Sequence, residues 1–117
     1  MKCIIIGCGK VGITLAEQLC QENHDVVIMD ASAKRMQDIP ENIDAMRIVG
    51  NGASIQAQME AGVNEADILI AVTGSDELNL LCCLIAKKAG KCSTIARVRN
   101  PVYSKEINFI KERLGVS

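Results

Sequence analysis

Hydrophobic residues occur along this chain in short continuous runs, separated by segments in which they recur every three or four positions. A continuous apolar run bounded by turn residues is typical of a strand that is buried on both faces of a sheet. This pattern predicts strands over residues 2–6, 25–29, 45–49, 67–72 and 93–98.

The segments between these runs have helical spacing. Val11, Leu15 and Leu19 form one apolar stripe, which predicts a helix that ends near Glu22. Further helices are predicted over residues 32–38, 54–61 and 76–89. They are followed by residues that disfavour helix, namely Pro40, Gly62 and Gly90. A last helix begins at Pro101, because proline is tolerated in the first turn.

Strands and helices alternate without a hairpin signal, so the strands are joined by crossovers and must be parallel. Right-handed crossovers then predict a Rossmann-like, doubly wound α/β fold with strand order 3-2-1-4-5 in three α/β/α layers. No repeat, low-complexity tract or linker interrupts the pattern, which predicts one domain over residues 1–117. The last helix is expected to end at Leu114, so we expect the sixth strand of a full Rossmann sheet to be missing.

Composition and charge narrow the function. The chain carries 13 basic and 14 acidic residues, and this balance provides no electrostatic footprint for nucleic acid. Its apolar runs are far shorter than the roughly 20 residues needed to span a bilayer, and its start shows no signal peptide pattern. The six cysteines show no C-x-x-C spacing, which favours reduced core thiols in the cytoplasm.

The candidate chemistry lies in a G-x-G-x-x-G run between the first strand and the first helix. Its members are Gly7, Cys8, Gly9, Lys10, Val11 and Gly12. An acid, Asp30, ends the second strand 18 residues after the last glycine (30 − 12), which is close to the spacing of a dinucleotide fingerprint. The motif therefore predicts pyrophosphate at the helix N-terminus and ribose at Asp30.

These residues also suit purely structural roles. The glycines could serve a tight turn alone, and Asp30 could cap the next helix. Lys10 could neutralise a phosphate or lie in solvent, whereas Cys8 fits as a small structural side chain. Gly50-Asn51-Gly52 and Thr73-Gly74 end two other strands, where ligands bind in open parallel sheets, but ordinary turn chemistry also suits them.

No catalytic grouping is evident. His24 is the single histidine and is expected at the end of the sheet opposite the ligand crevice, while Tyr103 is expected to pack in the last helix. No nucleophile–base pair stands out, and 117 residues leave no room for a substrate domain. The sequence predicts a binding module and no enzyme.

The chain resembles the TrkA-N, or regulator-of-potassium-conductance (RCK), family of nucleotide-binding domains. The similar stretches are Lys2–Gly12, His24–Val26 with Asp30, Gly50–Gly52, Ala61-Gly62, Ala66-Asp67, Ala71–Thr73, Asp76-Glu77, Asn79 and Ile95–Pro101. The resemblance implies a cytoplasmic regulator at the inner face of the membrane. It would form homo-oligomers, partner a membrane-embedded potassium transporter subunit, and respond to NAD(H) or to ATP, ADP or AMP.

The resemblance also assigns residues. Gly7–Gly12 would hold phosphates and Asp30 the ribose, while Asn51, where the family often has an acid, and Gly52 would lie on the adenine side. Thr73 would form the rim near the second ribose or the phosphates. Arg97 and Arg99 would reach phosphates or a partner subunit. The alternatives are a cofactor-binding fragment of a small NAD-dependent dehydrogenase, which would have catalytic motifs in neighbouring sequence, and a stand-alone nucleotide-binding scaffold.

Overall fold

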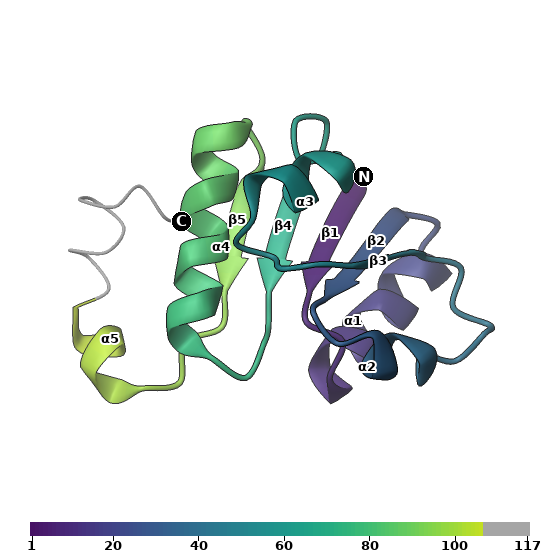
Figure 1. The fold of residues 1–117 in the computed structure, drawn as a ribbon, viewed down its shortest axis with the longest axis horizontal. Helices are drawn as coiled ribbons and strands as arrows, with labels where there is room; N and C mark the ends of the chain where they lie inside the picture. The colour runs from purple at the N-terminus through teal and green to yellow at the C-terminus, as the bar shows by residue number, and fades with distance from the viewer. Residues whose placement is uncertain (107–117) are drawn as a thin grey trace.

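The computed structural model describes residues 1–106, which form a five-stranded sheet with flanking helices (Figure 1). The strands are β1 Lys2–Ile6, β2 Asp25–Asp30, β3 Met46–Val49, β4 Ile68–Ala71 and β5 Ser93–Ala96. Every neighbouring pair is parallel, and the order is β3-β2-β1-β4-β5. The predicted topology is confirmed.

The helices are α1 Lys10–Gln21, α2 Ala33–Gln37, α3 Ile55–Glu60, α4 Asp76–Ala89 and α5 Pro101–Lys105. The first four agree with the predicted segments to within one residue where a boundary was given. The last helix begins at Pro101 as expected, and its expected continuation to Leu114 lies outside the described residues. Among the residues described, no helix has the length and apolar character to cross a membrane.

The fifth strand is shorter than the pattern predicts. It ends at Ala96, whereas the apolar run continues to Val98. The Arg97 amide still donates to the Ala71 carbonyl at 2.9 Å, but the next amides turn away from the sheet. Those of Arg99 and Asn100 donate to the side chain of Asp76, on α4. Polar contacts of α4 therefore end the strand, and no apolar pattern records them.

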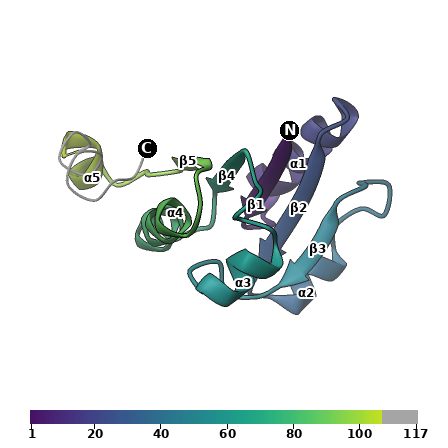
Figure 2. The ribbon, with the colours of Figure 1, turned by 90° about the horizontal axis from the view of Figure 1, so that it is seen from above.

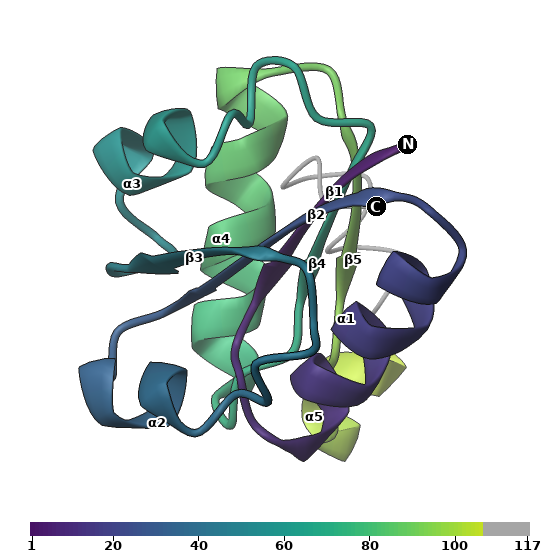
Figure 3. The same cartoon turned by 90° about the vertical axis from the view of Figure 1, so that its right-hand side faces the viewer.

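Two cores, one on each face of the sheet, give the predicted α/β/α layers (Figures 2 and 3). Ile5 points toward α1 and α2, while Ile4 and Ile6 point toward α3 and α4. All three are at most 1% exposed, because successive side chains of a strand point to opposite faces. Each buried isoleucine contributes about 1.5–3 kcal/mol, which explains why the strand is apolar throughout.

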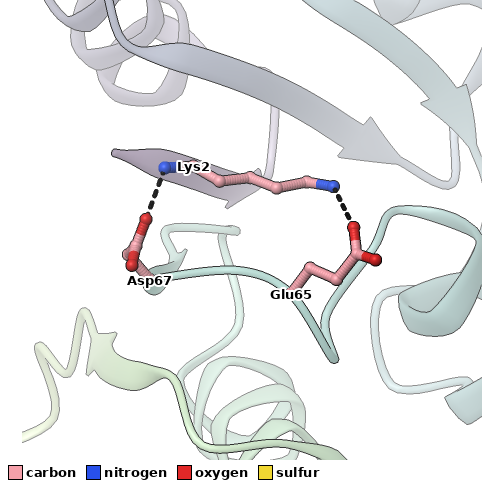
Figure 4. A network of polar contacts seen from close by, with 3 residues as sticks. All are labelled: Lys2, Glu65 and Asp67. Carbon is pink, nitrogen blue, oxygen red and sulfur yellow. Dashed lines mark hydrogen bonds and ion pairs between the residues drawn. The ribbon is translucent and has the colours of Figure 1, made fainter.

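A polar network closes the amino ends of β1 and β4 (Figure 4). The Lys2 amide donates to Asp67 Oδ2 at 2.7 Å, and Lys2 Nζ lies 3.6 Å from Glu65 Oε2. Gly62 has a φ of +88° and faces the lysine side chain, where a Cβ atom would collide with it. The network aligns the two strands at the sheet end opposite the glycine loop.

Candidate functional site

The glycine loop is shaped by close backbone approaches. Gly7 has a φ of +110°, and a Cβ atom there would lie 2.9 Å from the Thr73 nitrogen. A Cβ atom on Gly12 would collide with the carbonyl oxygen of Gly7. These two glycines are thus required by the path from β1 into α1, whether or not a ligand is present.

Gly9 is different, because no atom outside its immediate chain neighbours would meet a Cβ atom there within 4 Å. It is the N-cap of α1 and provides no side-chain hydrogen bond to the helix. In the four other described helices, the N-cap side chain accepts a bond from a backbone amide of its own helix. Those caps are Ser32, Ser54, Ser75 and Asn100. The N-terminus of α1 therefore has no side-chain cap, and the space beside Gly9 is open, as an anion site requires.

Asp30 ends β2 beside this loop. Its Oδ2 accepts from the Cys8 amide at 3.0 Å, and its Oδ1 accepts from the Ser32 amide at 2.8 Å. Burial acts to raise the pKa of Asp30, but the amide donors outweigh this effect and the net pKa lies below its usual value. The carboxyl therefore stays ionised at neutral pH. Ser32, not Asp30, caps α2. The Cys8 thiol also bonds this carboxylate, which still keeps acceptor capacity for a sugar hydroxyl.

A hollow of about 320 Å³ opens at the carboxyl ends of the strands, next to Asp30. It brings together four of the predicted site residues, Asp30, Asn51, Gly52 and Thr73. The remaining lining residues are Ile6, Ala31, Arg35, Gly74, Ser75 and Leu78. Neither the glycine loop nor Arg97 and Arg99 line this hollow.

The hollow includes residues that sequence reasoning missed. Arg35 lies on α2, five residues after Asp30, and its charge helps to lower the pKa of that carboxyl. The sequence signal that could have identified Arg35 is its position in the short helix directly after Asp30. Leu78 is an ordinary member of an apolar helix pattern, so only the fold reveals that it reaches the hollow.

The loop after β3 is held by its own polar groups. Asn51 Oδ1 accepts from the Ala53 amide at 2.9 Å, which is turn chemistry. The buried Gln58 Nε2 donates to the Gly52 carbonyl at 2.7 Å and to the Cys82 carbonyl at 2.9 Å. A Cβ atom on Gly52 would collide with Ile6, so this glycine lets the loop approach the sheet.

Arg97 is used differently from the expectation. Its Nη2 donates to the Val72 carbonyl at 3.0 Å and to the Thr73 carbonyl at 2.7 Å. The guanidinium is thus engaged by the loop after β4, which is why it does not reach the hollow. Arg99 is exposed and its Nη2 donates to the Gly74 carbonyl at 3.3 Å. A phosphate or partner contact stays a prediction for both arginines.

Three further side chains lie where a structural role was expected. Burial, with the neighbouring Asp30 carboxylate, raises the pKa of Cys8 to about 11, so its thiol stays protonated at neutral pH. His24 Nδ1 accepts from the terminal ammonium of Met1 at 3.0 Å, at the opposite end of the sheet. Tyr103 packs on the core beside α4 and donates to Glu77 at 2.7 Å. Within residues 1–106 no His, Cys, Asp and Glu group is arranged to hold a metal ion.

Comparison with known proteins identifies the family of this chain. The family model described as the TrkA-N domain matches residues 3–116. The chain belongs to the TrkA-N domain family. This TrkA-N domain is 45% identical over 103 residues to a Trk system potassium uptake protein TrkA homolog of Archaeoglobus fulgidus. It is 40% identical over 104 residues to the Trk system potassium uptake protein TrkA of Halomonas elongata. Each match covers 88% of the chain but 23% of the relative.

Solved structures show the same fold. The TrkA-N domain of the inner membrane protein ybaL from Escherichia coli superimposes with a TM-score of 0.83 at 22% identity, over 99% of this chain and 83% of that one. The GsuK channel bound to NAD gives a TM-score of 0.80 at 22% identity, over 93% of this chain and 20% of that one. The AMP-bound Kef C-terminal domain of Shewanella denitrificans gives a TM-score of 0.74 at 22% identity, over 100% of this chain and 69% of that one.

Proposed function

We propose that this chain is a nucleotide-binding regulatory domain of a potassium uptake system. The observation that carries the proposal is the open N-terminus of α1 at Gly9, beside the ionised carboxylate of Asp30. A diphosphate needs unpaired amides and a ribose needs a hydrogen-bond acceptor, and the two lie side by side here.

In this proposal each part of the nucleotide has its own place. The phosphates lie on the first amides of α1, where the exposed Lys10 side chain adds a positive charge. The ribose hydroxyls donate to Asp30, and the adenine enters the hollow next to Asn51 and Gly52. Thr73 forms the far rim. Arg97 and Arg99 act by holding that rim through backbone carbonyls.

The ligand class follows from the same groups. NAD(H), ATP, ADP and AMP all present an adenosine with free ribose hydroxyls, and solved structures with this fold are described as bound to NAD, ADP and AMP. A 2′-phosphate would meet the negative charge of Asp30, which disfavours NADP. The exposed Arg35 also lines the hollow, and its positive charge favours the ionised form of Asp30. The negative charge that repels a 2′-phosphate is therefore retained.

Regulation is the second part of the proposal. Residues 1–117 would form one domain that binds without turnover and assembles with further copies on the cytoplasmic face of a membrane-embedded potassium transporter subunit. The names of the relatives support the link to potassium uptake. A ligand gates a partner only through its difference in affinity for two conformations. The nucleotide would therefore have to bind one conformation of the assembled domains more tightly than the other.

Calorimetry on the purified chain tests the binding step. We expect NAD, NADH, ADP, ATP and AMP to bind, NADP to bind worst, and NADH absorbance to stay constant during incubation. Asp30→Asn should weaken NAD binding while narrowing its advantage over NADP, because the repelling charge is gone. NADP binding at least as tightly as NAD to the unmodified chain would disprove the role of Asp30. If none of these nucleotides binds, the proposed function is disproved.

A further inference from the structure

The described part of the chain contains a fully buried polar side chain that lies behind the hollow without lining it, Asn79 on α4. We propose that Asn79 is the positioning residue of the nucleotide site, acting through Thr73 to hold the rim after β4 in its binding shape. This inference rests on the proposed function, because the rim matters only if a nucleotide occupies the hollow.

The carboxamide of Asn79 uses its complete hydrogen-bonding capacity. Its Oδ1 accepts from the Thr73 amide at 2.8 Å and from the Thr73 hydroxyl at 2.6 Å. Its Nδ2 donates to the Thr73 carbonyl at 3.2 Å and to the Arg97 carbonyl at 2.9 Å. Aspartate lacks the two donors and leucine lacks all four groups, so asparagine is the side chain that fits.

The sheet itself does not hold this rim. Strand β4 ends at Ala71, and the last sheet-like bond of the loop runs from the Val72 amide to the Ile6 carbonyl at 2.8 Å. Beyond that point Thr73 depends on Asn79 for its amide, its hydroxyl and part of its carbonyl. Since Thr73 lines the hollow, the geometry of this part of the rim is set by a residue that does not line it.

The hydrogen of the Thr73 hydroxyl is used in the contact with Asn79 and is not available to a ligand. The hydroxyl donates toward Asn79 and accepts from the Ser75 amide at 3.2 Å. A nucleotide therefore meets the backbone of the rim and the side chain of Ser75 more readily than the hydroxyl of Thr73. This assignment differs from a direct contact by Thr73, because it makes affinity depend on the Asn79–Thr73 bond rather than on a bond to ligand.

The same carboxamide joins the rim to the chain after β5. Asn79 bonds the Arg97 carbonyl, and the Arg97 guanidinium bonds the Thr73 carbonyl in return. These bonds form a closed ring between the ends of two neighbouring strands. A nucleotide that stiffens Thr73 should therefore also stiffen the backbone at Arg97.

A double-mutant cycle tests the inference, with NAD titrated by calorimetry into the chain and its variants. We expect Asn79→Ala to raise the Kd for NAD about tenfold, the equivalent of roughly one positioning hydrogen bond. Thr73→Val alone should raise it about threefold, but by less than about 1.5-fold in the Asn79→Ala background, because the two residues act as one unit.

Val63→Ala is the matched control. Val63 is fully buried in the core on the α3–α4 face, in the loop that leads to the amino end of β4 and away from the hollow. It should lower the melting temperature while leaving the Kd for NAD within twofold, which separates positioning from general stability. Equal fold-changes for Asn79→Ala and this control at matched loss of stability would overturn the inference.

Two outcomes keep the inference distinct from the proposed function. If the unmodified chain does not bind NAD or ADP, the proposed function fails first. If it binds NAD and the Thr73→Val effect persists unchanged in the Asn79→Ala background, only the role of Asn79 fails. If Asn79→Ala does not fold, the inference is tested by two other measurements. These are the Kd of Thr73→Val for NAD and amide hydrogen exchange of the unmodified chain with and without NAD. We then expect a raised Kd and slower exchange at both Thr73 and Arg97 with NAD, and an unchanged Kd or unaffected Arg97 amide overturns the inference.

Discussion

Replacing Gly9 with alanine should separate the stability of this fold from its binding of nucleotide. The backbone of Gly9 has a φ of −73°, a value that alanine adopts without strain, and a Cβ atom there meets no other atom within 4 Å. The same methyl group would occupy the open space at the N-terminus of α1, where we place the phosphates. Substitution should therefore be tolerated by the fold and opposed by the ligand.

Two small effects on stability nearly cancel. Alanine restricts the unfolded chain and so adds about 0.4–1 kcal/mol to the free energy of unfolding. As an N-cap, alanine is poorer than glycine by about 0.5–1 kcal/mol. We expect a net change within about 1 kcal/mol, or a shift of the melting temperature of less than about 8 °C.

The effect on affinity should be much larger. A phosphate on the α1 amides makes charge-assisted hydrogen bonds, each worth roughly 1.5–3 kcal/mol. Loss of two such bonds raises the Kd by about a hundredfold or more. Calorimetry with ADP and NAD measures this change, and thermal unfolding monitored by circular dichroism measures the stability of the same samples.

Gly12→Ala provides the opposite case. Its Cβ atom would collide with the Gly7 carbonyl, so stability should fall by about 1–3 kcal/mol or more. If Gly9→Ala remained folded and still bound ADP with the affinity of the unmodified chain, phosphates could not lie on the α1 amides. That result would refute the placement of the ligand.

Three other contacts give measurable expectations. Amide donors hold the pKa of Asp30 below its usual range, so its stabilising contribution is present above about pH 4 and is lost as the pH falls through the lower pKa of the folded state. The free energy of unfolding of the unmodified chain should exceed that of Asp30→Asn by about 2 kcal/mol at pH 7. Urea titrations at pH 3 should show a smaller difference, and an unchanged difference contradicts the prediction. Burial raises the pKa of Cys82 to about 11 and that of Cys83 to about 12, so both should resist iodoacetamide at pH 8 in the native chain and react in urea, as mass spectrometry can show. Asp67→Asn weakens the bond from the Lys2 amide and should cost about 1 kcal/mol without changing the Kd for NAD, whereas a changed Kd would mean that the two sheet ends are coupled.

The apolar runs and the helical stripes were sufficient for the fold. A strand buried on both faces must be apolar throughout, so Ile4, Ile5 and Ile6 predict a covered parallel strand without any knowledge of the tertiary contacts. Helix ends were also predictable, since Pro101 and Gly90 act through local backbone geometry. The glycine motif and Asp30 likewise predicted their own positions, because their spacing is fixed by one strand, one turn and one helix.

What only the tertiary structure decided is how side chains distant in sequence divide their hydrogen bonds. Arg97 looked free to bind phosphate, but the end of β4 lies beside it and takes its guanidinium. Asn79 entered the sequence analysis only through the family resemblance, and the structure shows that it bonds Thr73 and Arg97 together. Periodicity records which face a residue occupies, whereas the partner of a buried donor depends on which strand ends become neighbours when the sheet forms.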